Sequence, residues 1–396
     1  MKVAFLTAGG IAPCLSASLG HFIKQYNEKS PEIELIAYKN GYKGLLLGDF
    51  ISIDDEIRKN AKKLYAFGGS PIGNSRVKLT NVKDCVKKGY ISEGQIPLEV
   101  AAKQLVKDEV TILHTIGGDD TNTTAADLVS YLSENNYELT VVGLPKTIDN
   151  DVYPISQTLG ASTAAEQSAL FFNNVVNENT TSSRQFIIHE VMGRNCGWLT
   201  AKSANVYREM LQKKEFLPEI LVNKKRWDIH AVFVPEMEIN MELEMNRLRE
   251  IMDKNDCVNI FLSEGAGLDS IISDMEKNGE KVNRDAFGHV RLDEINPGKW
   301  FAEKFANAIG AEKVLVQKSG YFARSAASNN EDLDLIFKSV EFAVDSALQQ
   351  NSGVAGLDDD LNSTMSCIDF KRIKGGKPFD VKESWFVDLL SNIGQY

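Results

Sequence analysis

The feature that most constrains the fold is a repeated order of segments: an apolar run of strand type, a glycine-rich turn, and then a helical pattern. The full order occurs at residues 2–28, 110–134, 183–205 and 257–277, and strands followed by turns are predicted at residues 33–46, 64–76 and 139–152. This alternation predicts a doubly wound, mostly parallel sheet with helices on both faces. Ligands bind such sheets at the carboxyl ends of the strands, where the glycine-rich and charged motifs follow.

The length and charge of the chain limit its organisation and its partners. A chain of 396 residues is too long for one ordinary core, so two domains are expected, with a boundary near residues 154–162. Hydrophobic residues make up 43% and charged residues 25%, as in a soluble globular protein. The net charge of −11 argues against a nucleic-acid partner, although a local basic cluster could still bind phosphate.

The sequence shows no targeting or membrane segment, so a cytoplasmic location without a membrane partner is expected. The apolar start at residues 3–10 is too short for a signal peptide, and no apolar run approaches the roughly 18 residues of a membrane span. The five cysteines are scattered without a CxxC pair, which favours reduced thiols over a disulfide framework or a zinc site.

Two glycine-rich turns are candidate sites for phosphate and metal. In "TAGGIAP", Gly9 and Gly10 let a ligand approach the backbone at a helix N-terminus, although a structural tight turn explains them equally well. In "GGDDT", residues 117–121, Asp119 is placed to hold Mg²⁺ directly or through water. The alternative is that one of the polar residues of this motif only caps the following helix.

The motif "PKTIDND", residues 145–151, carries the groups that phosphoryl transfer needs. In an extended chain Asp149 and Asp151 share a face, with Asn150 turned away. Lys146 adds a cation, and a carboxylate beside a substrate hydroxyl can accept its proton during the transfer. A solvated turn rich in Asp and Asn is the alternative.

Three later motifs place polar groups after predicted strands. Arg194 in "EVMGR" could meet phosphate or sugar oxygens, and Glu264 in "SEGAG" could accept a sugar hydroxyl. Tyr321 and Arg324 in "GYFAR" precede a helix. Each has an ordinary alternative: a surface ion pair, a helix cap and a plain loop.

Taken in order, these motifs together with "FGGSPIGNSR" resemble those of the phosphofructokinase family. Order and spacing both fit, from residue 5 to about residue 350. "TIDND" with "MGR" is highly specific, whereas the "GGD" turn also occurs in NAD kinases and lipid kinases of a related fold. The resemblance implies the α/β class with two doubly wound, Rossmann-like domains. Residues 1–155 with about 325–365 would bind the phosphate donor, and residues 156–324 with the C-terminal segment would bind the sugar phosphate.

The resemblance also indicates which donor the chain uses. Members that use ATP usually carry glycine where this chain has Asp120 and Lys146, so the chain resembles the pyrophosphate-dependent branch. Asp120 would fill the space of the α-phosphate of ATP and repel it, and Lys146 would steady the transferring phosphoryl group. The implied reaction is the Mg²⁺-dependent, reversible transfer of phosphate from pyrophosphate to the 1-hydroxyl of fructose 6-phosphate. It gives fructose 1,6-bisphosphate and phosphate and serves glycolysis and gluconeogenesis.

The resemblance assigns the remaining roles residue by residue. Asp149 would accept the proton of the 1-hydroxyl, within a catalytic set of Asp149, Lys146, Asp120 and Thr147. Asp119 would be the metal ligand, and Asp151 would support Mg²⁺ or the geometry of Asp149. The donor phosphates would meet Gly9, Gly10 and Arg76, with Lys78 as a weaker neighbour. The sugar phosphate would be held by Thr147, Ile148, Asp149, Met192, Gly193, Arg194, Glu264, Tyr321, Phe322, Ala323 and Arg324.

The chain departs from the family pattern in the first motif and in "GYFAR". Ile11 and Cys14 stand where an aspartate and a glycine are usual, which fits the loss of a nucleotide site. Tyr321 replaces the histidine of the family's segment that grips the 6-phosphate.

The arginines that some members supply from a neighbouring subunit have no clean match. Gln185 stands where the first would align, with Arg184 displaced by one position. The second has no counterpart, but an additional stretch at residues 285–310 carries His289 and Arg291, which could compensate, or the stretch could build an interface. The resemblance implies a homo-oligomer, either a dimer or a tetramer.

Several alternatives stay open at this point. The chain could be an ATP-dependent 6-phosphofructokinase or a non-catalytic regulatory subunit. It could also accept another sugar, such as sedoheptulose 7-phosphate. Asp120 and Lys146 count against ATP, and the intact "TIDND", "GGD" and "MGR" motifs count against a subunit that has lost catalysis.

Overall fold

The computed structural model of the protein describes residues 1–283 and 295–395, and these divide into two compact units. Unit 1 comprises Met1–Thr163 and Arg324–Lys377, and unit 2 comprises Ala164–Ala323 and Pro378–Tyr396. His289 and Arg291 lie outside the described residues.

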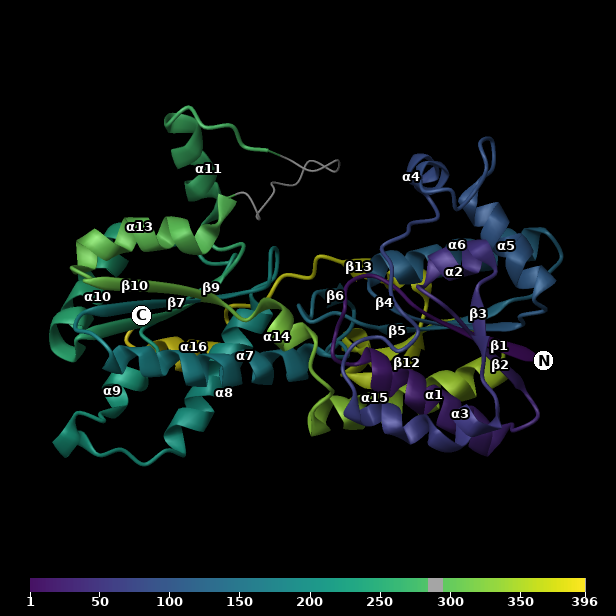
Figure 1. Ribbon diagram of the computed structural model, residues 1–396, viewed down its shortest axis with the longest axis horizontal. Helices are drawn as coiled ribbons and strands as arrows, with labels where there is room; N and C mark the ends of the chain where they lie inside the picture. The colour runs from purple at the N-terminus through teal and green to yellow at the C-terminus, as the bar shows by residue number, and fades with distance from the viewer. Residues whose placement is uncertain (284–294, 396) are drawn as a thin grey trace. The chain divides into compact units, whose positions relative to one another are not determined.

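The sheet of unit 1 is seven-stranded and mainly parallel (Figure 1). Its strands in spatial order are β12 (Thr364–Ile368), β11 (Gly353–Asp358), β5 (Thr140–Pro145), β4 (Ile112–Gly117), β1 (Lys2–Thr7), β2 (Glu34–Tyr38) and β3 (Phe50–Ser52). The outer strands β12 and β3 run antiparallel to their neighbours, and the other pairs are parallel. The central strands are apolar and almost wholly buried, as parallel strands covered on both faces must be.

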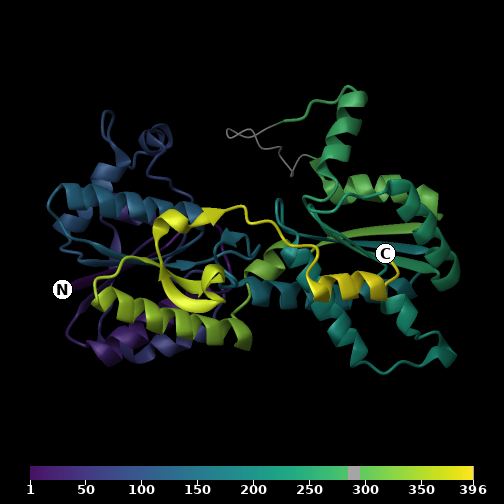
Figure 2. The same ribbon diagram turned by 180° about the vertical axis from the view of Figure 1, so that it is seen from behind.

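Helices cover both faces of this sheet. The helices of unit 1, with its 3₁₀ turns, are α1 (Leu15–Lys29), α2 (Tyr42–Leu47), α3 (Asp55–Asn60), η1 (Ala61–Ala66), α4 (Val82–Lys87), α5 (Pro97–Lys107), α6 (Asp119–Glu134), α15 (Asn330–Leu348), η4 (Asp359–Leu361) and η5 (Phe370–Arg372). The helices α1 and α15 lie on one face, and α2, α5 and α6 lie on the other (Figures 1 and 2). A small antiparallel ribbon joins β6 (Val152–Tyr153) to β13 (Lys374–Gly375), where the sequence suggests only a surface turn.

Unit 2 is built on a second sheet, with four parallel strands among its described residues. In spatial order they are β10 (Lys313–Lys318), β7 (Gln185–Val191), β9 (Cys257–Ser263) and β8 (Ala231–Phe233). The helices and 3₁₀ turns described are α7 (Ala161–Val175), η2 (Val176–Thr180), α8 (Trp198–Gln212), η3 (Pro218–Ile220), α9 (Lys224–Trp227), α10 (Met241–Asn255), α11 (Leu268–Lys277), α13 (Pro297–Ile309), α14 (Gly320–Arg324) and α16 (Ser384–Asn392). The helices α10 and α13 pack on one face, and α7, α8 and α16 on the other (Figure 1).

The observed architecture confirms the α/β class and the doubly wound, mainly parallel sheets. In unit 1 the chain leaves β1 for β2 on one side and later returns to β4 on the other side. This reversal of strand order is the switch point at which α/β sheets open a crevice at the carboxyl ends of their strands.

The prediction of a strand at residues 64–76 is wrong. Residues 61–66 form the 3₁₀ turn η1 and an irregular loop follows. The turn η1 packs on α1 instead of pairing in a sheet, and the Tyr65 hydroxyl hydrogen-bonds Nδ1 of His21 at 2.8 Å. A short apolar run cannot by itself distinguish a strand from a packed turn.

Unit 1 extends to Thr163, at the end of the 154–162 stretch in which the boundary is expected and beyond the domain limit at residue 155. Residues 156–163 belong to unit 1, where the Ser156 N–H donates to the Leu357 carbonyl at 2.9 Å. The Gly160 N–H donates to the buried Asp332 carboxylate at 3.0 Å. Arg324, expected in the sugar-binding domain, also falls in unit 1.

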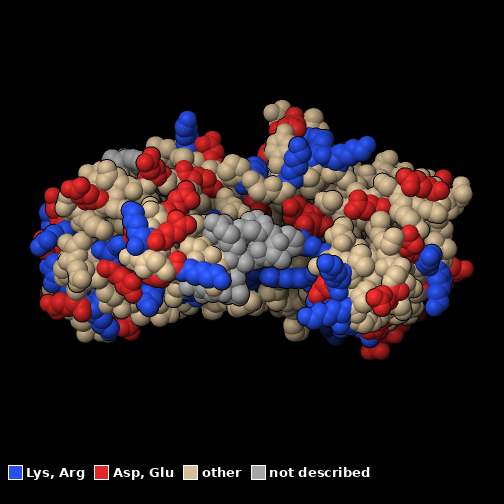
Figure 3. All heavy atoms as spheres, turned by 90° about the horizontal axis from the view of Figure 1, so that it is seen from above, with Lys and Arg blue, Asp and Glu red and all other residues tan. Residues whose placement is uncertain are grey.

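The surface and the cysteines add three observations. Acidic and basic side chains are interspersed on the face of each unit that Figure 3 draws. The five cysteines are all free thiols, and four of them are buried. Within residues 1–283 and 295–395, no helix combines the length and the apolar character that crossing a bilayer requires.

We predict that Asp332→Ala destabilises the protein by about 2–5 kcal/mol, because the buried N–H groups of Gly160 and Thr163 lose their acceptor. Chemical unfolding measures the change. Asp334→Ala is the matched control, since this exposed residue lies on the same helix and should change stability by no more than about 0.5 kcal/mol. Equal stabilities of the two variants would contradict the role of Asp332.

Candidate active site

The predicted donor-site motifs meet at the carboxyl ends of three neighbouring strands of unit 1. The strands β1, β4 and β5 are adjacent, with Thr7 beside Ile116 and Gly117 beside Pro145. Each strand therefore delivers its motif to the same edge: the first glycine turn after β1, the "GGDD" turn after β4, and Lys146 after β5. The Lys146 N–H donates to the Gly117 carbonyl at 2.9 Å, and this hydrogen bond joins the segment after β5 to the turn after β4.

These turns enclose a cavity of about 190 Å³ within unit 1. From the predicted set, its lining includes Asp119, Asp120, Lys146, Thr147, Ile148 and Arg324, together with both glycine turns. Asp151 and Val152 also line it, whereas Arg76 and Asp149 are not among the lining residues.

The first glycine turn is shaped for close approach. Gly9 has φ +85°, a left-handed conformation that glycine adopts without strain. A Cβ on Gly10 would lie 2.5 Å from Nη2 of Arg324, so only glycine leaves room for this guanidinium. Arg324 also donates from Nε to the Ile11 carbonyl at 2.9 Å. Arg324, predicted to hold the sugar phosphate, thus lies against the first glycine turn in this structure.

Lys146 is a buried cation at the centre of the site. Its side chain is 5% exposed, and Nζ donates to the Gly10 carbonyl at 2.8 Å. Burial, together with the charges of Arg324 and Arg76, lowers the pKa of Lys146 to about 8, although the charges of Cys14 and Asp149 act in the opposite direction. Of these charged groups, Arg324 lines the same cavity as Lys146.

The helix after the second glycine turn begins without a side-chain cap. Gly118 is the N-cap of α6, so the alternative that an aspartate or threonine of "GGDDT" serves as the cap is wrong. Asp119 and Asp120 occupy the first turn of the helix, where its positive dipole end favours acidic groups. Asp120 forms an ion pair with Lys78 at 2.6 Å.

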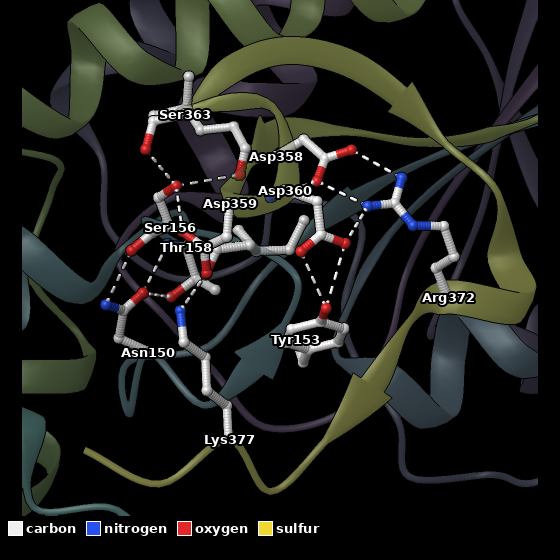
Figure 4. A network of polar contacts seen from close by, with 12 residues as sticks. Asn150, Tyr153, Ser156, Thr158, Asp358, Asp359, Asp360, Ser363, Arg372 and Lys377 are labelled. Atoms are coloured by element: carbon white, nitrogen blue, oxygen red, sulfur yellow. Dashed lines mark hydrogen bonds and ion pairs between the residues drawn. The ribbon is translucent and has the colours of Figure 1, made fainter. Parts of the chain in front are cut away.

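The "PKTIDND" loop is held by its asparagine and its threonine. Asn150 adopts φ +56° and turns inward, where its side chain accepts from the Thr158 N–H at 2.8 Å and donates to the Ser156 carbonyl at 3.2 Å (Figure 4). Thr147 Oγ1 donates to the Asp151 carboxylate at 3.1 Å and accepts from the Asp149 N–H at 3.1 Å. Asn150 thus lies in a left-handed turn and not in the extended chain that the sequence prediction assumed.

Two carboxylates of the cavity could hold a divalent cation. Asp119 and Asp151 both line the cavity. Burial raises the pKa of Asp151, and the negative charge of Asp119 raises it further. Among the described residues there is no group of three or more His, Cys, Asp or Glu side chains suited to a metal. Mg²⁺ does not need one, because it commonly binds one or two carboxylates together with substrate phosphates.

A second group of predicted residues gathers in unit 2. Val191 at the end of β7 lies beside Ser263 at the end of β9, so "MGR" and "SEGAG" leave adjacent strands. The Gly193 N–H donates to the Glu264 carboxylate at 3.3 Å, and Ser263 Oγ donates to the Gly193 carbonyl at 2.5 Å. Burial raises the pKa of Glu264, while the charge of Arg194 lowers it. The structure thus brings Gly193, Arg194 and Glu264 together.

The residues of the "GYFAR" segment differ in their exposure and in the unit to which they belong. Tyr321 and Phe322 are 72% and 52% exposed in unit 2, and Met192 lies near the start of their helix, 3.8 Å from a Cβ built on Gly320. Ala323 is buried and offers no accessible side chain. Arg324 belongs to unit 1.

Two amides that the sequence analysis passed over fix the glycine turns. Asn74 donates from Nδ2 to the Gly9 carbonyl at 3.0 Å, and the buried Asn122 donates from Nδ2 to the Gly118 carbonyl at 3.1 Å. Asn122 follows "GGDD" closely in sequence and could have been suspected from that position. Asn74 is brought to Gly9 only by the fold.

The family profile described as phosphofructokinase matches residues 2–332 of the chain. The chain is 61% identical over 394 residues to the pyrophosphate–fructose 6-phosphate 1-phosphotransferase of Methylotuvimicrobium alcaliphilum, with 100% of this chain and 96% of that protein covered. It is 56% identical over 393 residues to the protein of the same name from Mastigamoeba balamuthi, with 99% and 96% covered.

A solved structure has the same fold at low sequence identity. The pyrophosphate-dependent phosphofructokinase from Marinobacter aquaeolei matches with a TM-score of 0.70 and 18% identity, over 99% of this chain and 91% of that one. At this identity the likeness concerns the fold alone.

Proposed function

The chain belongs to the phosphofructokinase family, and we propose that it is a member that uses pyrophosphate. It transfers a phosphoryl group from pyrophosphate to the 1-hydroxyl of fructose 6-phosphate, and fructose 1,6-bisphosphate and phosphate are formed. The observation that carries the proposal is the pair Asp120 and Lys146 in the lining of one cavity. ATP-using members usually have glycine at both positions. The names of full-length relatives at 61% and 56% identity support the same donor.

In the proposed donor site, three cations surround the place of the pyrophosphate. Lys146 and Arg324 line the cavity, and the charge of Arg76 acts on Lys146. Cations fixed in a partly buried site favour an anion with several charges, and they need no reorganisation during the reaction. If the two terminal phosphates of a nucleotide occupied the place of pyrophosphate, Asp120 would repel and obstruct the α-phosphate that follows them.

Asp119 and Asp151 would hold Mg²⁺ at this site, together with oxygens of the donor. Both residues line one cavity, and a divalent cation would relieve the repulsion between their charges. When bound, Mg²⁺ supplies neutralisation of the phosphate oxygens and helps to orient the donor.

Asp149 would act as the proton acceptor. As the sugar oxygen forms its bond to phosphorus, the bond to the leaving phosphate breaks, and the hydroxyl proton passes to the Asp149 carboxylate. Lys146, buried in the lining of the cavity, would stabilise the negative charge of the transferring group. Thr147 would orient the loop through its bonds to the Asp149 N–H and the Asp151 carboxylate.

The sugar phosphate would be recognised by the unit 2 cluster. Arg194 supplies a cation for phosphate or sugar oxygens, Glu264 accepts a sugar hydroxyl, and Met192 offers an apolar surface. Tyr321 and Phe322, exposed on the neighbouring helix, would add contacts to the sugar. We also propose that the enzyme acts in the cytoplasm as a homo-oligomer, a dimer or a tetramer, as the family resemblance implies.

Initial rates with fructose 6-phosphate and Mg²⁺, measured side by side with pyrophosphate or ATP, test the proposal. Turnover with pyrophosphate and none with ATP is expected. Turnover with ATP alone would overturn the donor assignment. Absence of turnover with both donors would favour a non-catalytic subunit.

We predict that Asp149→Asn lowers kcat by roughly 10²–10⁴-fold, because the isosteric amide cannot accept the proton. Calorimetric titration with pyrophosphate should meanwhile give nearly the wild-type affinity, since Asp149 is not a lining residue of the donor cavity. Near-normal turnover of the variant would remove Asp149 from this role.

We predict that Asp120→Gly, alone or combined with Lys146→Gly, gives measurable ATP binding, because both the obstruction and its charge are removed. Calorimetric titration with MgATP detects the gain. Asp127→Gly is a suitable control, since this residue lies on the same helix outside the cavity lining. If neither variant binds ATP better than the wild type, the account of Asp120 is wrong.

We predict that kcat/KM for pyrophosphate falls as the pH rises through about 8, the pKa of Lys146 in the free enzyme. Burial lowers this pKa, so the lysine loses its charge within the accessible pH range, and the anionic donor then meets one cation fewer. Besides the two arginines, three titratable groups interact electrostatically with Lys146: Asp149, Asp151 and the buried thiol of Cys14.

Lys146→Arg controls for ionisation of the donor, since a guanidinium keeps its charge at these pH values. In this variant the fall in kcat/KM for pyrophosphate should move to higher pH. A wild-type profile that is level between pH 7 and pH 10 would contradict the prediction.

A further inference from the structure

A C-terminal segment of unit 1 crosses the candidate metal site. We call it the strap and define it as Arg372–Lys377. Its glycines and lysines are typical of an exposed turn, and no sequence motif gives it a role. In the structure β13 of the strap pairs with β6, which directly follows the "PKTIDND" loop, with Gly375 beside Val152.

The strap is fixed at its beginning by Arg372. The guanidinium binds the fully buried Asp358 carboxylate through two hydrogen bonds of 2.7 and 2.8 Å and binds Asp360 at 2.6 Å (Figure 4). Tyr153 donates its hydroxyl to the same Asp360 at 3.0 Å, so the ribbon and the arginine share an acceptor. A bidentate arginine–carboxylate pair with a buried acid resists displacement.

Lys377 fixes the end of the strap. Its Nζ donates to the Asp359 carboxylate at 2.6 Å and to the Ile155 carbonyl at 2.9 Å (Figure 4). Its backbone N–H donates to the Asp151 carbonyl at 2.8 Å. The strap is therefore bonded directly to one of the two residues assigned to the metal.

Gly375, between these two fixed points, lies against the other residue assigned to the metal. A Cβ on Gly375 would meet Oδ2 of Asp119 at 2.2 Å and Cγ at 2.7 Å. Atoms cannot approach so closely, so an alanine here would force the carboxylate to rotate or the strap to lift. The next residue, Gly376, differs: a Cβ there would meet no atom within 4 Å.

We propose that Gly375 is a positioning residue for the metal site, and that its missing side chain sets the direction of the Asp119 carboxylate. The strap holds Asp151 by a backbone hydrogen bond and leaves a space of fixed width for Asp119, so that both carboxylates turn toward one cation. The inference rests on the proposed function, which assigns these residues to Mg²⁺.

The test measures metal binding without turnover. Mn²⁺, which is detected by electron paramagnetic resonance, replaces Mg²⁺, and methylenediphosphonate replaces pyrophosphate because it cannot transfer its phosphoryl group. Gly375→Ala is expected to weaken Mn²⁺ binding by about 10–100-fold, as changes to the groups that orient metal ligands usually do.

Two control variants separate positioning from general damage to the strap. Gly376→Ala adds the same methyl group in open space and, since Gly376 has φ +78°, strains the strap. It should lower the melting temperature but keep the wild-type Mn²⁺ affinity. Lys374→Ala, which alters an exposed side chain of the strap, should change neither property.

A double-variant cycle covers the case in which Gly375→Ala folds poorly. In an Asp119→Ala background the carboxylate is gone, so Gly375→Ala should change neither the melting temperature nor the Mn²⁺ affinity further. An equal effect of Gly375→Ala in both backgrounds would overturn the inference, as would wild-type Mn²⁺ affinity of the single variant. Absence of Mn²⁺ binding by the wild-type protein would instead contradict the proposed metal site.

Discussion

The arrangement of the candidate site depends on the parallel pairing of β1, β4 and β5. Parallel strands end at the same edge of a sheet, so three motifs far apart in sequence leave the sheet side by side. Register makes the meeting specific: Gly117 pairs with Pro145, and Lys146 then bonds back to the Gly117 carbonyl. A shift of either strand would separate the lysine from the glycine turns, and the cavity would lose its central cation.

The buried lysine explains why glycines surround it. Lys146 keeps a charge in a poorly hydrated place because its Nζ donates to the Gly10 carbonyl at 2.8 Å. A Cβ on Gly9 would approach Nζ to 3.2 Å, and one on Gly10 would collide with Arg324. Cations held this closely repel one another, which lowers the pKa of Lys146 together with burial. A multiply charged anion relieves that repulsion, so the pocket favours a compact polyphosphate.

Sequence reasoning predicted the parts of the fold that depend on a local pattern of residues. Apolar runs followed by glycine turns predicted β1, β4, β5, β7 and β9, and hence the edge to which Asp119 and Lys146 are delivered. It failed where long-range contacts decide. Residues 64–66 pack on α1 instead of pairing, Arg324 lies against the first glycine turn, and the strap lies against the proposed metal site. No periodicity marks such contacts, because they arise only when distant segments fold together.

Calorimetric titration of the wild-type protein with pyrophosphate and with ATP, each in the presence of Mg²⁺, tests the central claim most directly. The claim is that the strand ends of unit 1 form a pocket for a diphosphate and exclude a nucleotide. The account predicts saturable binding of pyrophosphate and no competition by ATP for the same site. Binding of ATP that displaces pyrophosphate at comparable concentration would contradict it, because Asp120 and Lys146 would then not select the donor.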